Sequence, residues 1–214
     1  MTVTLDLPAT QTATLTMLPL THPALRRVRE WTQQADVHQA VMSLFPAILP
    51  GAATERRSGA GILHRHDAPA RRAARLLVQH GAALRPEVAN DADLRQADLQ
   101  VLLARFEAGS HVRFRVVLNA VRSQTQTHKR FAVTDPDGLV TFGVERLTRS
   151  GLTAVRLADR PRTELKQTGR SALWTAQYDG AAIVVDPEAV KKAVLSGIGR
   201  GKAYGCGLLS LATA

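Results

Sequence analysis

The chain has 214 residues, of which 45% are hydrophobic and 21% are charged, so it can form a packed core and lacks the composition of a disordered protein. Its length allows one domain of ordinary size or two of about 100 residues each. No stretch approaches the roughly 18 consecutive apolar residues of a membrane helix, and the first residues do not resemble a signal peptide. We therefore expect a cytoplasmic protein. The single cysteine, Cys206, excludes an intramolecular disulfide and a thiolate-rich zinc site.

A large excess of basic residues indicates a polyanionic partner. Lys and Arg number 28 against 18 Asp and Glu, which gives a net charge of +10, and 23 of the 28 are Arg. The planar guanidinium group suits bidentate contacts with phosphate, so nucleic acid is the expected partner. An arginine-rich genome is the alternative explanation. Because only 4% of the residues are aromatic, we do not expect recognition by stacking of many bases on rings.

The first half of the chain predicts the order strand, helix, strand, strand, helix, strand. The strands are expected over 12–20, 61–66, 74–79 and 99–103, the first helix over 36–45, and a short helix within 81–95. In the first helix, Asp36 is the expected N-cap, Val37 and Val41 begin the apolar stripe, and Pro46 ends the helix. This order is that of the ferredoxin-like fold, which RNA-recognition modules also use.

The order repeats after Gly109. Strands are expected over 112–118, 181–185 and 207–211, and helices over 139–149 and 186–195, with a polar, basic segment over 156–170. Arg113 and Arg115 share one face of the first of these strands, while Val112, Phe114 and Val116 occupy the other. The expected fold is therefore α+β, with two tandem ferredoxin-like (RNA-recognition-motif-like) domains at residues 1–108 and 109–214.

A glycine-rich loop follows the last predicted helix. Gly197 to Gly207 contains five glycines in eleven positions. The phosphate-binding loop of nucleotide hydrolases needs a glycine where Ser196 stands and Ser or Thr where Ala203 stands, so that pattern fails, and the dinucleotide-binding pattern fails as well. Two alternatives remain: a loop whose bare backbone, with basic side chains beside it, lies against a phosphate backbone, or a flexible connection between helix and strand.

His38 is the histidine best placed for chemistry. It lies at the edge of the apolar stripe of the first helix, so its imidazole can extend from the core boundary into a cleft and exchange a proton near neutral pH. His64 and His66 share a strand face, but no further ligand is near in sequence, and we expect no metal site. His22 and His80 border loops and are expected at the surface.

Three segments match motifs of one known family. They are the C-terminal stretch Gly197-Ile198-Gly199 with Lys202-Ala203-Tyr204-Gly205-Cys206-Gly207-Leu208-Leu209-Ser210-Leu211-Ala212, the helix motif His38-x₅-Leu44-Phe45-Pro46, and the strand motif Phe114-Arg115-x₃-Asn119. Over nearly its whole length the chain resembles the CasE family, the CRISPR RNA-processing endoribonucleases of the type I-E Cascade complex.

The resemblance implies a metal-independent endoribonuclease, without cofactor, that cleaves CRISPR precursor RNA on the 3′ side of the repeat stem-loop and keeps the product as a Cascade subunit. The 2′-hydroxyl of the RNA is the nucleophile in such a reaction, so the protein supplies geometry, proton transfer and positive charge. The family's catalytic histidine corresponds to His38. Members usually carry a tyrosine three residues earlier, where this chain has Ala35. The implied partners are the stem-loop of the CRISPR repeat RNA and other Cascade subunits, with no membrane.

We expect the RNA stem to bind a basic surface of the second half together with the glycine-rich loop. The expected RNA-binding residues are Arg113, Arg115, Arg156, Arg160, Arg162, Lys166, Arg170, Gly199, Arg200, Gly201 and Lys202. Two alternatives stay open. A non-catalytic RNA-binding scaffold subunit of the same complex would tolerate loss of His38, and a DNA-binding protein would not distinguish RNA from DNA.

Overall fold

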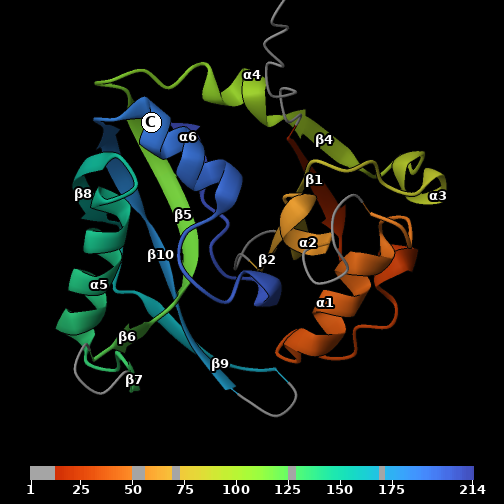
Figure 1. Ribbon diagram of the computed structural model, residues 1–214, viewed down its shortest axis with the longest axis horizontal. Coiled ribbons are helices and arrows are strands. Elements are labelled where there is room, and N and C mark those ends of the chain that lie inside the picture. The colour runs from red at the N-terminus through yellow and green to blue at the C-terminus, as the bar shows by residue number, and fades with distance from the viewer. Residues whose placement is uncertain (1–12, 50–55, 69–72, 125–128, 169–171) are drawn as a thin grey trace, which may run out of the picture.

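The computed structural model describes residues 13–49, 56–68, 73–124, 129–168 and 172–214. Two antiparallel sheets stand side by side in Figure 1, one formed by the first half of the chain and one by the second. The glycine-rich loop, near the centre of the view, and the strand β9, in its lower part, extend from the second half toward the first.

The first sheet has the strand order β2-β3-β1-β4, with all neighbours antiparallel. Its elements are β1 (Thr14–Pro19), the 3-10 turn η1 (Pro23–Leu25), α1 (Gln34–Ser43), α2 (Arg56–Gly59), β2 (Leu63–Asp67), β3 (Arg75–His80), α3 (Pro86–Ala89) and β4 (Arg95–Asp98). The helix α1 buries Val37 and Val41 against Leu18, Leu76 and Val78 of the sheet. The apolar stripe predicted for this helix is therefore confirmed.

The start of α1 differs from the prediction. The helix begins at Gln34, and its N-cap residue Gln33 makes no side-chain capping bond. Asp36 lies in the first turn instead of at the cap, where a carboxylate still interacts favourably with the positive end of the helix dipole.

The segment predicted as a strand over 99–103 is a helix, α4 (Leu99–Leu103). The carboxylate of Asp98 accepts a hydrogen bond from the backbone of Gln100 at 2.7 Å and so caps it. Leu99 and Leu103 are buried while Val101 is 56% exposed, which fits a helix, because in a strand these three residues would share a face. The strand is the preceding β4, whose four residues are all exposed and give no apolar pattern.

The second sheet repeats the topology of the first, with the order β11-β5-β10-β8. Its elements are β5 (His111–Asn119), the small hairpin β6 (Val121–Ser123) and β7 (Arg130–Ala132), α5 (Pro136–Thr148), β8 (Leu152–Leu157), β9 (Arg162–Gln167), β10 (Ala172–Val184), α6 (Pro187–Ser196), the 3-10 turn η2 (Lys202–Tyr204) and β11 (Ser210–Thr213). In the first sheet β1 pairs with β3 and β4, and in the second β5 pairs in the same way with β10 and β11. The additional strand β9 pairs with β10 alone. The predicted tandem ferredoxin-like fold is therefore confirmed.

The basic segment predicted over 156–170 belongs to two strands. β8 and β9 pair with successive parts of the long strand β10, and β9 has only one buried residue, Lys166. Such a strand lacks the apolar alternation by which strands are predicted from sequence.

Each sheet has its own hydrophobic core. α5 and α6 cover the face of the second sheet that carries Val112, Phe114 and Val116, as predicted for that face, and leave Arg113 and Arg115 on the opposite face. α4 of the first half also packs into this second core, through Leu99, Leu103 and the following Phe106. The boundary predicted at residues 108 and 109 lies between α4 and β5 and remains a prediction.

His22 and His80 were expected at the surface, and both are buried. His80 Nδ1 donates to the carbonyl of Ala82 at 2.6 Å, and its Nε2 accepts from the hydroxyl of Thr16 at 2.8 Å. His22 Nε2 lies 3.2 Å from a carboxylate oxygen of Asp91. His22 Nδ1 accepts from the amide of Ala24 at 3.1 Å. Both rings thus have polar partners inside the fold, which the position next to a loop does not indicate.

Candidate active site

His38 lies on α1 at the edge of the apolar stripe and is half-buried. Its neighbours on the buried side, Val37 and Val41, are almost inaccessible to solvent. Ala35, one turn earlier, is exposed. The position of His38 agrees with the sequence prediction of a ring that extends from the core boundary.

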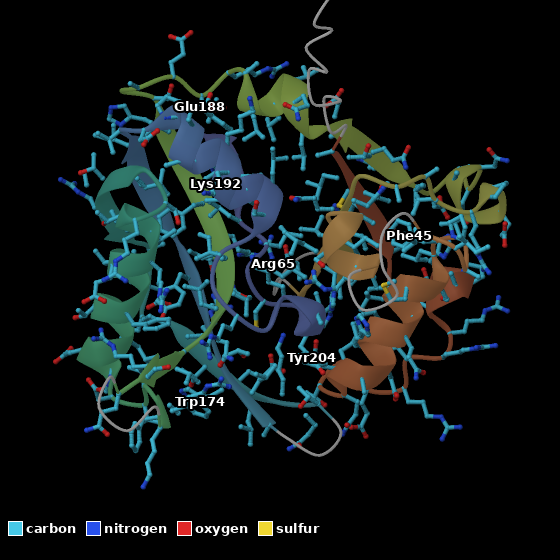
Figure 2. The ribbon with its side chains drawn as sticks, in the orientation of Figure 1. Phe45, Arg65, Trp174, Glu188, Lys192 and Tyr204 are labelled. Atoms are coloured by element: carbon cyan, nitrogen blue, oxygen red, sulfur yellow. The ribbon has the colours of Figure 1, made fainter. Side chains whose placement is uncertain are left out.

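The glycine-rich loop of the second half closes over His38. The ring of Tyr204 in η2 lies 6.4 Å from the His38 ring, centroid to centroid, at an interplanar angle of 60°. His38 also forms a hydrogen bond with the backbone of Ala203. Figure 2 shows Tyr204 between the two halves of the molecule, near α1. The tyrosine beside the histidine therefore comes from the far end of the chain, not from position 35.

One cation, Arg57, lies close enough to His38 to affect its pKa, and a second cation, Lys202, lies close to Arg57. Burial lowers the pKa of His38 from its ordinary value of 6.5, and the positive charge of Arg57 lowers it further, against the opposing effect of the hydrogen bond to Ala203. Burial and Arg57 also lower the pKa of Lys202. Arg57 is fixed by a 2.6 Å hydrogen bond from its guanidinium to the carbonyl of Ile62, and Lys202 by one of 2.6 Å to the carbonyl of Ser196. At neutral pH the site therefore holds a neutral imidazole near the positive charge of Arg57, and Lys202 lies near the same arginine, on the turn that also carries Ala203.

A second histidine, His64 on β2, is buried behind this site, with 1% of its surface exposed. Burial lowers its pKa to about 3, and the charges of His38, Lys166 and Arg57 contribute to the shift. Neither of its ring nitrogens has a hydrogen-bond partner among the described residues. His64 is therefore a neutral ring that forms part of the wall of the site.

The backbone of the glycine-rich loop depends on its glycines. All five have positive φ angles, between 73° and 89°, which other residues rarely adopt. At Gly207 a β-carbon would lie 2.7 Å from the carbonyl oxygen of Ile198, whereas at Gly199 it would meet no atom within 4 Å. The amides of Ile198 and Gly207 donate to the carbonyls of Gly207 and Val117 at 2.8 and 2.7 Å. The loop is thus hydrogen-bonded within itself and to β5, against the alternative of a flexible connection.

An arginine-lined groove begins where the loop leaves α6. It is an open cavity of about 720 Å³ between α5, the β6–β7 hairpin, the start of β10 and the loop. We call the following residues the arginine groove: Arg122, Arg130, Arg146, Arg149 and Arg200. The guanidinium groups of Arg122 and Arg146 lie 6.0 and 5.2 Å from the centre of the Phe142 ring. Gly199 and Arg200 lie in this groove while Ala203 and Tyr204 lie near His38, so the loop joins the two places.

The structure brings together part of the basic surface predicted from the sequence. Arg113, Arg115 and Arg156 line an open hollow of about 590 Å³ on the sheet face that α5 and α6 leave free. Arg162 extends the same face, since it pairs with Gln177, two residues before Asp179 on β10. We call these four arginines the sheet-face surface.

The other predicted RNA-binding residues have different surroundings. Arg115 of the sheet-face surface is engaged in an ion pair with Asp179. Arg160 is exposed in the turn between β8 and β9, but Lys166 is buried, with 5% of its surface accessible. Its ammonium group lies 3.7 Å from the carboxylate of Glu164, so it does not extend the exposed basic surface. Arg170 lies outside the described residues.

Sequence reasoning missed Arg57, Tyr204 and most of the arginine groove. Arg57 lies on the one-turn helix α2, and Tyr204 was noted only as part of the C-terminal motif. Four of the groove arginines come from elements that no basic cluster marks in the sequence. The signal that was available is the glycine-rich loop itself, because a loop with so many glycines allows close approach of another part of the chain.

In the part of the chain that the structure describes, no three His, Cys, Asp or Glu side chains come together in a group that could hold a metal ion. None of the described helices is long and apolar enough to cross a membrane. The thiol of Cys206 is buried, and burial raises its pKa to about 12.

Two ferredoxin-like units that enclose a histidine, and that present an arginine-lined groove beside it, define an α+β protein of the nucleic-acid-binding type. The chain belongs to the family of CRISPR-associated proteins, whose sequence profile, described as "CRISPR associated protein", matches residues 14–213. The family resemblance drawn from the sequence motifs is thereby confirmed. A comparison with curated proteins gave no significant match.

Solved structures with the same fold cover nearly the whole chain. Thermus thermophilus Cse3 bound to an RNA representing a pre-cleavage complex is 23% identical, with a TM-score of 0.70, and the match covers 94% of this chain and 99% of that one. Escherichia coli K-12 Cas6e is 18% identical over 94% and 100% of the two chains, with a TM-score of 0.62. A chain of a CRISPR RNA-guided surveillance complex in a pre-nicking state is 26% identical over 95% and 100%, with a TM-score of 0.64.

Proposed function

We propose that this protein is an endoribonuclease that cleaves CRISPR precursor RNA on the 3′ side of the repeat stem-loop, in the cytoplasm, and remains on the product as a subunit of a Cascade complex. The observation that carries the proposal is the glycine-rich loop, which runs from the arginine groove to His38. One RNA can therefore place its stem on the groove and the adjoining phosphate at the histidine.

The reaction is an internal transesterification. His38, neutral because burial and Arg57 lower its pKa, accepts the proton of the ribose 2′-hydroxyl as the 2′-oxygen attacks the phosphorus. The bond from phosphorus to the 5′-oxygen breaks, and this oxygen takes a proton from the ammonium group of Lys202, which its lowered pKa makes a stronger acid. Arg57 and Lys202 also stabilise the negative charge that develops on the phosphate. The products end in a 2′,3′-cyclic phosphate and a 5′-hydroxyl.

The arginine groove suits a phosphate backbone better than the sheet-face surface does. Its five arginines line one open cavity, and the structure gives only one of them a carboxylate partner, Arg122 with Glu145 at 3.4 Å. On the sheet-face surface, by contrast, Arg115 is neutralised by Asp179 and lies 3.8 Å from Asp67. The sheet-face surface remains a second candidate for the stem because Arg113, Arg156 and Arg162 are exposed there.

The test is cleavage of a panel of hairpin RNAs in EDTA under single-turnover conditions, with wild type and His38→Ala. We expect wild type to cut in EDTA and His38→Ala to be slower by roughly 10²–10⁴-fold with little change in RNA affinity. A requirement for magnesium, or a 5′-phosphate on the product, contradicts the mechanism. Tight RNA binding without cleavage by wild type supports the scaffold alternative, and equal affinity for a 2′-deoxy hairpin supports the DNA-binding alternative.

A further inference from the structure

Two side chains of the β2–β3 hairpin hold the two ends of the glycine-rich loop. Gln79 Nε2 donates to the carbonyl of Leu195, in the last turn of α6 before the loop, at 2.8 Å. Arg65 Nη1 donates to the carbonyl of Leu208, directly after the loop, at 2.9 Å. Both side chains are buried, with 1% and 2% of the surfaces of Arg65 and Gln79 exposed. We call these two residues the loop anchors.

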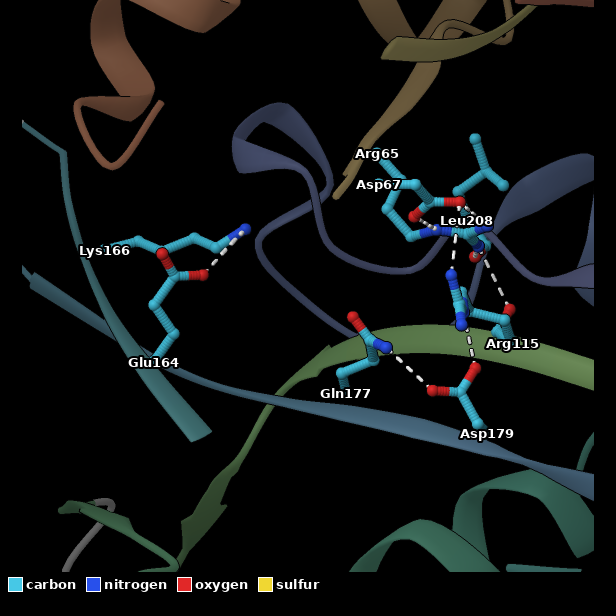
Figure 3. A network of polar contacts seen from close by, with 8 residues as sticks. All are labelled: Arg65, Asp67, Arg115, Glu164, Lys166, Gln177, Asp179 and Leu208. Carbon is cyan, nitrogen blue, oxygen red and sulfur yellow. Dashed lines mark hydrogen bonds and ion pairs between the residues drawn. The ribbon is translucent and has the colours of Figure 1, made fainter. Parts of the chain in front are cut away.

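Arg65 is fixed by bonds on all sides of its guanidinium group. Its Nε and Nη2 donate to the two carboxylate oxygens of Asp67 at 2.6 and 2.9 Å, and its Nη1 also donates to the carbonyl of Arg115 at 3.1 Å. Figure 3 shows this network continuing through Arg115 to Asp179 on β10. A buried guanidinium with a bidentate carboxylate partner has one orientation, so the carbonyl of Leu208 is held at a fixed place relative to β2.

The anchored loop is the segment that meets His38. Between its two ends lie Ala203, whose backbone bonds His38, and Tyr204, whose ring lies 6.4 Å away. Five glycines with positive φ angles give this segment little conformational preference of its own. The hydrogen bonds within the loop and to Val117 give the loop its shape. The contacts at its two ends join it to the first half of the molecule, which carries the histidine.

We propose that Arg65 and Gln79 are positioning residues, which act through the glycine-rich loop to hold Ala203 and Tyr204 at His38 and, with them, Lys202 of the same turn. The inference rests on the proposed endoribonuclease activity. In that reaction the proton acceptor lies on α1 and the proton donor on the loop, so their separation depends on the two anchors, which join the loop to the first half. A displacement of about 1 Å at a reacting group can cost on the order of 100-fold in rate.

The variants are Gln79→Met and Arg65→Lys, with Arg65→Met as the more severe change. Each has a matched control: Gln96→Met removes a side-chain amide that bonds Thr16 on the same sheet at 3.2 Å, and Arg105→Lys changes an exposed arginine after α4.

We expect the single-turnover rate at saturating protein to fall by roughly 10- to 100-fold for the anchor variants and to stay within about twofold for the controls. Affinity for a hairpin with a 2′-deoxy cleavage site should change by less than about twofold, and Arg65→Lys should retain more activity than Arg65→Met.

A second readout follows the loop without RNA. In the anchor variants, hydrogen exchange in residues 197–207 should be faster, while α1 should exchange as in wild type. The pKa of His38, followed by NMR titration, should rise, because burial is the main cause of its lowering and a displaced loop exposes the ring.

Normal hydrogen exchange in the loop of the anchor variants, or faster exchange with an unchanged cleavage rate, overturns the inference. If wild type cleaves no hairpin, the proposed function is wrong. The hydrogen-exchange data then still test whether Arg65 and Gln79 hold the loop in place. Gln79→Met is close in shape to glutamine and keeps the test valid if the arginine variants do not fold.

Discussion

At the scale of single residues, the site joins groups that have opposite protonation states at neutral pH. His38 is neutral and Lys202 is charged, although both are partly buried and both lie near Arg57. A base and an acid that are both ready near pH 7 are what an internal transesterification needs. Arg57 contributes to both states, because its charge lowers the pKa of the imidazole and of the ammonium group.

The cleavage rate should depend on pH in the way these shifts require. Since the pKa of His38 lies below 6.5, the single-turnover rate should rise with pH only in the acidic range and reach a plateau by about pH 7. Arg57→Met removes a positive charge that disfavours the imidazolium form, so the acidic limb should move to higher pH. Rates measured from pH 4.5 to 9 in EDTA will show this. An acidic limb centred above pH 7 in wild type would contradict the assignment of His38 as the base.

Lys202 and Tyr204 should differ in their contributions. Lys202→Met removes the proposed acid and a charge beside the phosphate, and should slow cleavage by roughly 10²–10³-fold. Tyr204→Phe keeps the ring that packs near His38 and should remain within about threefold of wild type. A phosphorothiolate substrate, whose 5′-sulfur leaves without protonation, should restore most of the rate to Lys202→Met. If Tyr204→Phe is the slower variant and the thio substrate restores it instead, the tyrosine is the acid.

His64 should make the stability of the fold depend on pH. Its pKa is about 3 in the folded protein and near 6.5 when unfolded, so between these values only the unfolded state takes up the proton. The free energy of unfolding therefore falls as pH falls below 6.5, by at most about 1.4 kcal/mol per pH unit for this group. Urea titrations at pH 7.5, 6 and 5 will measure it. His64→Leu should show a smaller loss toward pH 5, and an equal loss would mean that other groups cause the acid sensitivity.

Single residues were predictable where local periodicity determines their environment. The stripe beside His38 indicated its half-buried position, and the alternation in 112–118 indicated that Arg113 points away from the helices, as observed. Arg57 and Tyr204 were not predictable as site residues. They reach His38 only because two distant segments meet, and no pattern within a short window records such a meeting.

At the scale of elements, the glycine-rich loop contains glycines at which a β-carbon would clash with other atoms and glycines at which it would not. Alanine substitutions at the two kinds of position should have different effects. Gly207→Ala places a β-carbon 2.7 Å from the carbonyl of Ile198 and should distort the loop, lower the melting temperature and abolish fast cleavage. In Gly199→Ala the β-carbon meets no atom within 4 Å. The substitution should lower the free energy of unfolding by about 1–2 kcal/mol, because alanine must adopt the φ angle of 74°. Its folded protein should cleave within about tenfold of wild type.

Melting curves and single-turnover rates of the two glycine variants provide the comparison. Gly199 also lies in the arginine groove, so a loss of RNA affinity in Gly199→Ala without a loss of stability would indicate contact with the stem. Equal effects of the two substitutions on stability would contradict the distinction drawn here.

Among the elements, most of those with an apolar face were predicted and most of those without one were not. The exception is β10 (Ala172–Val184), of which only 181–185 was predicted although Ala176 and Tyr178 are also buried. α1, α5 and α6 and the buried strands β3 and β5 were found close to their actual ranges. β4 and β9 were missed because their side chains are nearly all exposed. α4 was predicted as a strand because five residues, Leu99 to Leu103, are too few for a helical period to be distinguished from an apolar strand.

At the scale of the whole molecule, two basic surfaces compete for the RNA stem, and salt dependence should distinguish them. The double variant Arg146→Gln with Arg149→Gln should weaken stem-loop binding and lower the slope of log affinity against log salt by up to about two. The matched variant Arg113→Gln with Arg156→Gln removes the same charge from the sheet-face surface. If the second pair lowers the slope and the first does not, the stem lies on the sheet face.

The packing of α4 determines when the protein can fold. Its side chains Leu99, Leu103 and Phe106 belong to the first half in sequence but are buried in the core of the second half. A nascent chain that has emerged only as far as this helix has nothing to cover them, so the first half cannot complete its native structure during synthesis until the strands of the second half follow. The two halves should then unfold in a single transition, and nuclease activity should be absent from either half when it is produced alone. No RNA can therefore be cut before synthesis reaches the C-terminal strand.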